Sequence, residues 1–316
     1  MQIITKEQIE KLLPYNQLIS ALQKGFQEEI VVPLRHHHTY QNPSKADSIL
    51  LLMPAWKVGE YVGVKIITVS PDNGAIQLPS VQGVYLLFHA INGIPLAQME
   101  AKTLTNRRTA AASALASTFL SRKDSHSLLM VGTGNMAPAL IEAHATIRPI
   151  DQVFVWGRNV DKAKTVVQQF QNHPFTIQAV EDLEKYARQV DIISCATLSN
   201  DPLIKGSWLQ AGQHLDLVGS FTPTMRETDN EAIMKSAVYV DIIEGATKES
   251  GDIVIPMEQG ILDIAAIQGD LFSLCKGEAT GRQSDESITL FKSVGHALED
   301  LVAAKMVYEG LNSNLS

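Results

Sequence analysis

The chain has 316 residues, 45% of them hydrophobic and 19% charged, and its 26 basic and 34 acidic side chains give a formal net charge of −8. A folded protein of this length has room for two domains. No apolar run reaches the roughly 18 to 20 residues that cross a bilayer, and no segment supplies the concentrated basic face that nucleic-acid binding requires. The first 13 residues do not form a signal-peptide core. We therefore expect a cytoplasmic protein with no membrane and no nucleic-acid partner.

The first 120 residues predict two short helices followed by a mostly antiparallel sheet. Thr5 and Gln8 form a capping-box pattern, and apolar residues follow at helical spacing. Turn residues, among them Pro54 and Asn92-Gly93, separate the segments that have strand composition. The expected strands cover 49–53, 61–70, 82–88 and 95–99, and an Ala-rich helix follows over about 105–120.

After residue 120 the pattern changes to short apolar strands that alternate with helices. This alternation predicts a parallel, doubly wound sheet. Strands are expected at 127–131, 152–156, 191–196, 214–218, 238–241 and 288–293, and helices at 137–145, 161–171 and 180–189, with a final helix after 293.

A glycine-rich turn links the strand at 127–131 to the next helix and reads Gly132-Thr133-Gly134-Asn135-Met136-Ala137. The first glycine permits a tight turn, the second lets the backbone approach a pyrophosphate, and Ala137 lets helix and strand pack closely. Free N–H groups at the helix N-terminus would bind the phosphates. Between a strand and a helix, this motif predicts dinucleotide binding.

The end of the next strand indicates which dinucleotide is preferred. An NAD-selective site normally places Asp or Glu there, but this chain has Gly157-Arg158. Gly157 leaves room, and Arg158 is a bidentate partner for a 2′-phosphate. We therefore expect NADPH to be preferred over NADH; an ordinary solvated loop arginine is the alternative.

Two cations occupy positions that look buried. Lys65 lies in an apolar strand with both faces apparently covered, and Arg108 lies on an inward helical stripe from which Arg107 is rotated by about 100°. Arg107 is thus the expected surface residue. Buried cations need anionic partners, so a carboxylate substrate or a cofactor phosphate is expected, with an internal ion pair as the alternative. Arg35 could supply a third positive group.

Metal binding is not expected. Neighbours in the run His36-His37-His38 would point to opposite faces of a strand, and no second ligand cluster accompanies them. Cys195 and Cys275 have neither the number nor the spacing of a disulfide framework, and we expect both to be buried thiols.

Six segments occur in the order found in the ornithine cyclodeaminase/mu-crystallin family, namely 63–66, 104–111, 131–134, 194–197, 218–220 and 287–295. The chain resembles that family over nearly its whole length, most specifically in the T-x-x-R-T-A-A helix and the I-T-L-F-K-S-V-G strand end. The resemblance implies a homodimer of α/β class, with a Rossmann-type doubly wound parallel sheet inserted into a second α+β domain. Residues 1–120 plus 290–316 would form the substrate-binding and dimerisation domain, and 121–289 the NAD(P)-binding domain.

The resemblance also implies site residues. Arg35, Lys65 and Arg108 would hold a substrate carboxylate, with Lys65 and Arg108 as the catalytic candidates. Ser80 and Arg108 would lie near the nicotinamide, and Ser293 would bond its amide beside Val294, which would contact the substrate. The remaining cofactor-binding positions would be Gly132, Gly134, Asn135, Met136, Arg158, Thr197, Val218, Gly219 and Ser220.

One departure from the family indicates the reaction. In the cyclodeaminases an aspartate follows the strand-end glycines and handles the amino group of ornithine, but here Phe221 follows Gly219-Ser220. Phe221 cannot exchange a proton, and its ring suits a flat cyclic imine. The segment 219–227 is similar to the reductase branch of the family. The expected reaction is NAD(P)H-dependent reduction of the cyclic imino acid Δ1-pyrroline-2-carboxylate to L-proline, with Δ1-piperideine-2-carboxylate as a second candidate substrate that would give L-pipecolate.

Three alternatives stay open at this stage. They are an ornithine cyclodeaminase, which Phe221 disfavours, an amino-acid dehydrogenase acting on alanine, and a mu-crystallin-like binding protein without turnover. No residue is an obvious acid for the imine nitrogen; solvent, or Lys65 through a water, are the candidates.

Overall fold

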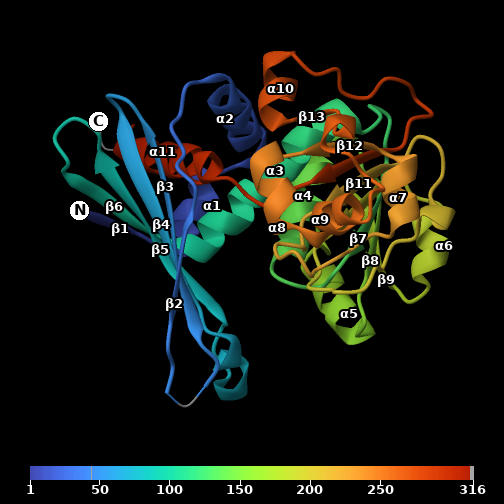
Figure 1. Cartoon of the computed structure of the whole chain (residues 1–316), viewed down its shortest axis with the longest axis horizontal. Coiled ribbons are helices and arrows are strands. Elements are labelled where there is room, and N and C mark those ends of the chain that lie inside the picture. The colour runs from blue at the N-terminus through green and yellow to red at the C-terminus, as the bar shows by residue number, and fades with distance from the viewer. Residues whose placement is uncertain (44, 314–316) are drawn as a thin grey trace. The chain divides into compact units, whose positions relative to one another are not determined.

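The computed structural model describes residues 1–43 and 45–313 (Figure 1). The chain divides into two compact units: unit 1 is Met1–Thr109 with His296–Ser316, and unit 2 is Ala110–Gly295. Among the described residues, no helix is both long enough and apolar enough to cross a membrane.

Unit 1 contains a six-stranded sheet in the order β1-β6-β5-β4-β3-β2. Its neighbours pair antiparallel, as expected, except that β1 pairs parallel with β6. The sequence analysis missed β1 and β2. The strands are β1 (Gln2–Ile4), β2 (His36–Tyr40), β3 (Ser48–Lys57), β4 (Tyr61–Val69), β5 (Val81–His89) and β6 (Pro95–Glu100), and a 3₁₀ turn covers Pro71–Ile76.

Helices cover one face of this sheet (Figure 1). The last helix, α11 (Ala297–Ser313), packs on β3, β4 and β5 and against α2 (Tyr15–Gln27). The predicted capping box is confirmed, since Thr5 and Gln8 cap α1 (Lys6–Leu12) reciprocally. The covered face carries Lys65 at 3% exposure, together with buried apolar and aromatic side chains.

The opposite face of the sheet is only half-buried, so the expectation that both faces of β4 are covered is wrong for the single chain. Cross-strand register places apolar residues side by side on it, as in the row Leu52–Ile66–Val84. We call this the open face; it consists of Leu50, Leu52, Pro54, Trp56, Val62, Val64, Ile66, Val84, Leu86 and Phe88.

Pro54 does not end a strand, contrary to the sequence analysis, because β3 continues to Lys57. Trp56 exchanges backbone hydrogen bonds with Val31 on the β2 side of the strand. Pro54, two residues earlier, presents its nitrogen to the same side. There β2 begins only at the pair His36 and Leu52, so no ladder partner meets the missing N–H of Pro54.

Unit 2 is built on an eight-stranded parallel sheet in the order β13-β12-β14-β11-β10-β7-β8-β9, with helices on both faces (Figure 1). This confirms the expected doubly wound, Rossmann-type α/β fold. The strands are β7 (Ser127–Val131), β8 (Gln152–Trp156), β9 (Thr176–Val180), β10 (Ile192–Cys195), β11 (His214–Leu217), β12 (Ala237–Val240), β13 (Gly269–Asp270) and β14 (Thr289–Lys292). The helices are α4 (Met136–Ile147), α5 (Val160–Gln168), α6 (Leu183–Ala187), α7 (Asn230–Lys235), α8 (Ile243–Glu249), α9 (Gly251–Glu258) and α10 (Leu271–Lys276), with 3₁₀ turns at Gly206–Trp208 and Ile264–Ala266.

Two helix starts differ from the prediction. The helix α3 (Ala101–Leu120) begins four residues before the expected start near 105, because the Glu100 carboxylate accepts hydrogen bonds from the N–H groups of Lys102 and Thr103. The helix expected at 180–189 begins only at Leu183, since Val180 ends β9. The sequence analysis also missed the edge strands β9 and β13. In β9 exposed and half-buried residues alternate, and β13 is only two residues long.

Candidate functional sites

Unit 1 contains a buried cluster of two cations and two carboxylates. Lys65 Nζ on β4 lies 2.7 Å from Asp300 Oδ2 on α11. Arg108 on α3 donates from Nε to Asp300 Oδ1 at 2.9 Å and from Nη1 to Glu299 Oε2 at 2.6 Å. Both carboxylates are fully buried, and Arg108 is 4% exposed. The predicted burial of Lys65 and Arg108 is thus confirmed, and the internal ion pair considered as the alternative is present.

The cluster shifts the pKa values of its members. Burial, and then the charge of Arg108, lower the pKa of Lys65 to about 8, against the opposing pull of Asp300. Burial alone would raise the pKa of Asp300, but the charges of Arg108 and Lys65 hold it below its usual range. Lys65 is therefore a group that exchanges its proton near neutral pH.

The charge of Arg35 also lowers the pKa of Lys65, so this half-buried arginine lies within electrostatic reach of the cluster. The remaining expected site residue of unit 1, Ser80, is half-buried beside the start of β5, where its carbonyl accepts from Ser70 N at 2.8 Å.

Arg107 is not the surface residue that the sequence analysis expected. Its guanidinium donates from Nε and Nη2 to the carbonyl of Leu13 at 3.2 and 2.6 Å, and it stacks 3.9 Å above the ring of Tyr15. The expectation failed because α3 is enclosed on more than one side. Arg107 therefore fastens α3 to the N-terminal helices.

Glu299 and Asp300 were missed by the sequence analysis. They lie in the first turn of α11, where acidic residues are common because they complement the helix dipole. Their flanking residues Leu298 and Leu301 are buried. An acidic pair between core leucines was the available signal of an internal partner.

The glycine-rich turn of unit 2 lies at the point where the strand order reverses, between β7 and β10. Gly132 has a φ of +124°, and a Cβ there would come within 2.6 Å of the Ala196 carbonyl oxygen. The region around Gly134 is open. Asn135 precedes α4 without a side-chain cap. Ala137 N donates to the Gly134 carbonyl at 3.1 Å and Pro138 has no N–H, so in the first turn of this helix the Met136 N–H is the one left for an anion.

Arg158 is exposed and makes no hydrogen bond or ion pair with any residue that the structure describes. The neighbouring Asn159 caps α5, and Gly157 lies against Thr133, where a Cβ would come within 2.6 Å of its methyl group. Arg158 therefore extends from the β8 end with its guanidinium uncommitted, as a 2′-phosphate contact requires.

The other expected cofactor residues lie at the same carboxyl edge of the sheet. Thr197 follows β10, and Val218 and Gly219 follow β11. The hydroxyl of Ser293, after β14, donates to Asp241 Oδ2 at 3.1 Å, and Val294 N donates to the same oxygen at 2.7 Å. Ser220 is fully buried, with its hydroxyl donating to the Met225 carbonyl at 2.7 Å.

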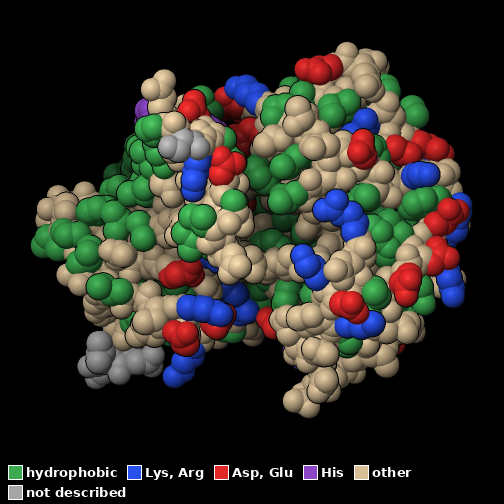
Figure 2. Space-filling view, turned by 90° about the horizontal axis from the view of Figure 1, so that it is seen from below, with side chains coloured by type: hydrophobic (Ala, Val, Ile, Leu, Met, Phe, Trp, Pro, Cys, Tyr) green, Lys and Arg blue, Asp and Glu red, His purple; other side chains and the backbone are tan. Residues whose placement is uncertain are grey.

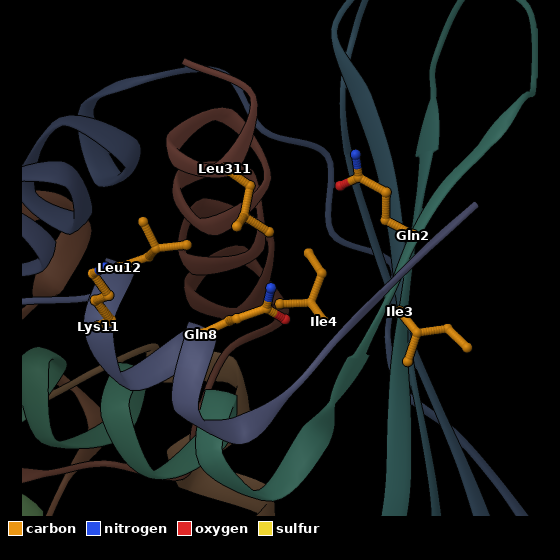
Figure 3. A pocket seen from close by; sticks show the side chains of 7 residues that line it. All are labelled: Gln2, Ile3, Ile4, Gln8, Lys11, Leu12 and Leu311. Carbon is orange, nitrogen blue, oxygen red and sulfur yellow. The ribbon is translucent and has the colours of Figure 1, made fainter. Parts of the chain in front are cut away.

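A separate cavity in unit 1, of about 740 Å³, contains none of the expected site residues (Figure 3). Aliphatic and amide side chains form most of its lining, which includes one ionisable side chain, a lysine. The lining residues are Gln2, Ile3, Ile4, Gln8, Lys11, Leu12 and Leu311. Among the residues described here, no group of three or more potential metal ligands is gathered. Cys195 and Cys275 are buried and form no disulfide with a described residue.

These features define unit 2 as a dinucleotide-binding domain of the Rossmann class, attached to a unit with a buried cation cluster. Comparison with known proteins agrees. Residues 1–314 match the model of the ornithine cyclodeaminase/mu-crystallin family, and the chain belongs to that family.

Three relatives illustrate the similarity. The Δ1-pyrroline-2-carboxylate reductase of Colwellia psychrerythraea is 38% identical over 98% of this chain and 99% of its own. The structure of the Thermococcus litoralis Δ1-pyrroline-2-carboxylate reductase, in complex with NADH and L-proline, is 34% identical with a TM-score of 0.93, covering 99% of this chain and 98% of that one. An archaeal alanine dehydrogenase dimer with bound NAD is 28% identical with a TM-score of 0.91, covering 100% and 97%.

Proposed function

We propose that this protein is an NAD(P)H-dependent imine reductase that converts Δ1-pyrroline-2-carboxylate, and also Δ1-piperideine-2-carboxylate, to L-proline and L-pipecolate. The observation that carries the proposal is the buried Lys65–Arg108 pair, which the acidic residues Glu299 and Asp300 hold in place. Its support from outside the molecule is the similarity to reductases named for this substrate.

The cation cluster of unit 1 is suited to a small carboxylate. Arg108 uses Nε and Nη1 for the acidic pair, and its Nη2 makes no hydrogen bond to the residues that the structure describes. Together with Lys65 and Arg35, this nitrogen would bind the substrate carboxylate and orient the ring.

The carboxyl edge of the sheet in unit 2 fits the cofactor. The open approach at Gly134 and the uncapped start of α4 would hold the pyrophosphate, and Arg158 the 2′-phosphate of NADPH. When bound, the reduced nicotinamide supplies the hydride for the C=N carbon. The protonated Lys65 ammonium would hold the carboxylate of the substrate, or pass a proton through water to the imine nitrogen.

The proposal is tested by following NADPH oxidation with Δ1-pyrroline-2-carboxylate and with pyruvate plus ammonia. L-ornithine with NAD⁺ is assayed by ammonia release, because its conversion to proline and ammonia involves no net oxidation or reduction. We expect rapid oxidation with the cyclic imine, at a kcat/KM at least about a hundredfold above that of the other two reactions. Turnover with pyruvate and ammonia alone would instead favour an alanine dehydrogenase. Cofactor binding without turnover of any substrate would favour a binding protein.

The same assay tests the preference for NADPH over NADH. Replacing Arg158 with alanine removes a charge-assisted contact to the 2′-phosphate, so KM for NADPH would rise by roughly tenfold while KM for NADH stays unchanged. NADH is the matched control, because it lacks the 2′-phosphate. An unchanged KM for NADPH would leave Arg158 as an ordinary solvated arginine.

We also propose that the protein is a homodimer joined through the open face of unit 1. The face carries a continuous apolar row across β3, β4 and β5, and hydrophobic side chains gather at the left of the view in Figure 2, on the part formed by unit 1. A structural neighbour is described as a dimer. We further propose a reducing, cytoplasmic location, in which the buried cysteines Cys195 and Cys275 would stay as thiols.

The dimer predicts a sedimentation mass twice that of one chain. Ile66 lies in the middle of the open face, between Leu52 and Val84, and Ile66→Glu would bury a charge there and give monomers. Ile91, at the β5–β6 turn, is 76% exposed, so Ile91→Glu is the matched control and would stay dimeric. A dimeric Ile66→Glu variant would place the interface elsewhere.

A further inference from the structure

Glu227 is a buried carboxylate that joins the ends of two neighbouring strands in unit 2. Its Oε1 accepts from the backbone N–H of Thr197 at 2.7 Å and from the Thr197 hydroxyl at 2.9 Å, and its Oε2 accepts from Gly219 N at 2.8 Å. Thr197 follows β10 and Gly219 follows β11. Glu227 itself is fully buried.

The two strand ends approach each other too closely for any side chain at position 219. A Cβ on Gly219 would come within 2.0 Å of the Thr197 carbonyl oxygen and 2.6 Å of Glu227 Oε1. The backbone N–H groups of Thr197 and Gly219 both depend on the same carboxylate. Loss of that carboxylate would leave two donors unsatisfied and release the spacing of the two strand ends.

A second carboxylate holds Glu227 in turn. Asp252 Oδ1, at the start of α9, accepts from the N–H groups of Glu227 and Thr228 at 2.8 and 3.2 Å. Asp252 Oδ2 lies 3.5 Å from Lys292 Nζ, at the end of β14, and both side chains are fully buried. The network therefore ties the carboxyl ends of β10, β11 and β14 to one another.

We infer that Glu227 is a positioning residue for dinucleotide binding, which acts by fixing the main chain of Thr197 and Gly219 at the carboxyl edge of the sheet. The inference rests on the dinucleotide site proposed above, in which both residues line the cofactor. Glu227 does not itself contact the cofactor, because both of its carboxylate oxygens accept hydrogen bonds from the two strand ends.

The ionisation of Glu227 adds a second readout. Burial raises the pKa of Glu227 to about 7, with Lys292 opposing and Asp252 reinforcing the shift. The other titratable groups packed near this network are Cys195 on β10, Asp216 on β11 and Arg226, which directly precedes Glu227. A protonated Glu227 carries a hydrogen on one oxygen and loses an acceptor for one of its donors.

This ionisation affects folding and cofactor binding with opposite signs. Because the folded-state pKa is raised above the ordinary 4.5, acidification from pH 7 towards pH 4.5 favours the folded state through Glu227. Over the same range, cofactor binding would weaken, because the strand ends lose their clamp. A purely structural role would not separate the two effects.

The experiment measures the Kd of NADH by fluorescence titration, since NADH has no 2′-phosphate that titrates near neutral pH. At pH 8 we expect Glu227→Gln to raise Kd at least about tenfold, because the amide NH₂ meets an N–H donor. Removal of a buried charge whose pKa is raised offsets the cost of that unsatisfied donor, so the midpoint of thermal unfolding would change little. Glu227→Asp keeps the charge and would give an intermediate Kd. With saturating NADH, kcat for the imine would stay within about threefold.

The matched control is Asp191→Asn. Asp191 is the equivalent clamp at the opposite, amino edge of the sheet, where it accepts from the N–H groups of His126 and Ser127 at 2.9 and 3.1 Å. This variant would lose stability and keep the Kd for NADH. An unchanged Kd in a folded Glu227→Gln variant overturns the inference, while a wild-type protein that binds no dinucleotide at all would overturn the proposed function instead.

The wild-type protein supplies a test that does not depend on any variant folding. Its Kd for NADH would rise by about tenfold between pH 8 and pH 6, as expected for a required carboxylate with a pKa about one unit above the lower pH. A folded Glu227→Gln protein would lack this dependence. A wild-type Kd that is constant over the range contradicts the clamp.

Discussion

Replacing Arg108 with lysine is expected to lower kcat/KM for Δ1-pyrroline-2-carboxylate by at least about a hundredfold, close to 3 kcal/mol of transition-state stabilisation. Arg108 reaches Glu299 and Asp300 through two different nitrogens, and a third nitrogen remains for the substrate. A lysine ammonium is a single point donor on a flexible stem and cannot reproduce this fork. Charge is conserved in the variant, so the loss would measure geometry.

The control for this prediction is the adjacent residue. Arg107 is equally basic and lies on the same helix, but it bonds the carbonyl of Leu13 and stacks on Tyr15. Arg107→Lys would lower the thermal midpoint and leave kcat/KM within about twofold. If Arg107→Lys and Arg108→Lys lost activity equally, the loss would reflect damage to α3 and not substrate recognition.

Two other outcomes for Arg108→Lys have different meanings. A larger KM with little change in kcat would indicate that Arg108 binds the substrate carboxylate equally in the ground and transition states. Retention of kcat/KM within about twofold would show that Arg108 serves only the internal ion pair with Glu299 and Asp300.

The sequence predicted the burial of Arg108 but not the groups that surround it. A guanidinium on an inward stripe is visible from local periodicity alone. Its partner Asp300 is 192 residues away, and the pairing arises only when α11 returns to pack on the first sheet. Glu299 and Asp300 look locally like ordinary first-turn acids, so the sequence gives their charge and not their partner.

Pro54 and Glu227 show a similar limit. Whether a proline interrupts a strand depends on the lateral partner of its missing N–H, and the neighbouring strand here begins one pair too late to offer one. Glu227 lies in a loop, and in sequence it resembles any polar loop residue. Its burial follows from the close approach of the ends of β10 and β11, which is a property of the assembled sheet.

The glycine-rich turn was predicted more completely, because its function depends on neighbours in sequence. The strand, the turn and the helix lie within about twenty residues, and each glycine has a local reason. The positive φ of Gly132 and the open space around Gly134 are consequences of that local geometry. Sequence reasoning therefore succeeds where the partners are close along the chain.

The activity is expected to fall as the pH rises through about 8, the pKa of Lys65. Below this pH the ammonium is charged and can hold the substrate carboxylate or supply a proton; above it, both capacities are lost. The logarithm of kcat/KM would decline with a slope near −1 at alkaline pH. Lys65→Ala would lower kcat/KM by at least about a hundredfold at pH 7, and its pH profile would lack the alkaline decline.

The stability of the protein would respond in the opposite direction over the same range. Between pH 8 and pH 10.5 the unfolded chain keeps the Lys65 proton that the folded chain has already lost. Raising the pH across this interval therefore favours folding through Lys65 while it removes activity. Thermal midpoints measured alongside the rate profile would show that the alkaline loss of rate is not unfolding.

A variant of the partner carboxylate separates the enzyme's titration from that of the substrate. The charge of Asp300 raises the pKa of Lys65, whereas burial and Arg108 lower it. Asp300→Asn would therefore move the alkaline decline to lower pH, and Lys65→Arg, which stays charged, would remove it. The imine ionises identically in every assay, so a decline that keeps its position in both variants would belong to the substrate and exclude Lys65 as the titrating group.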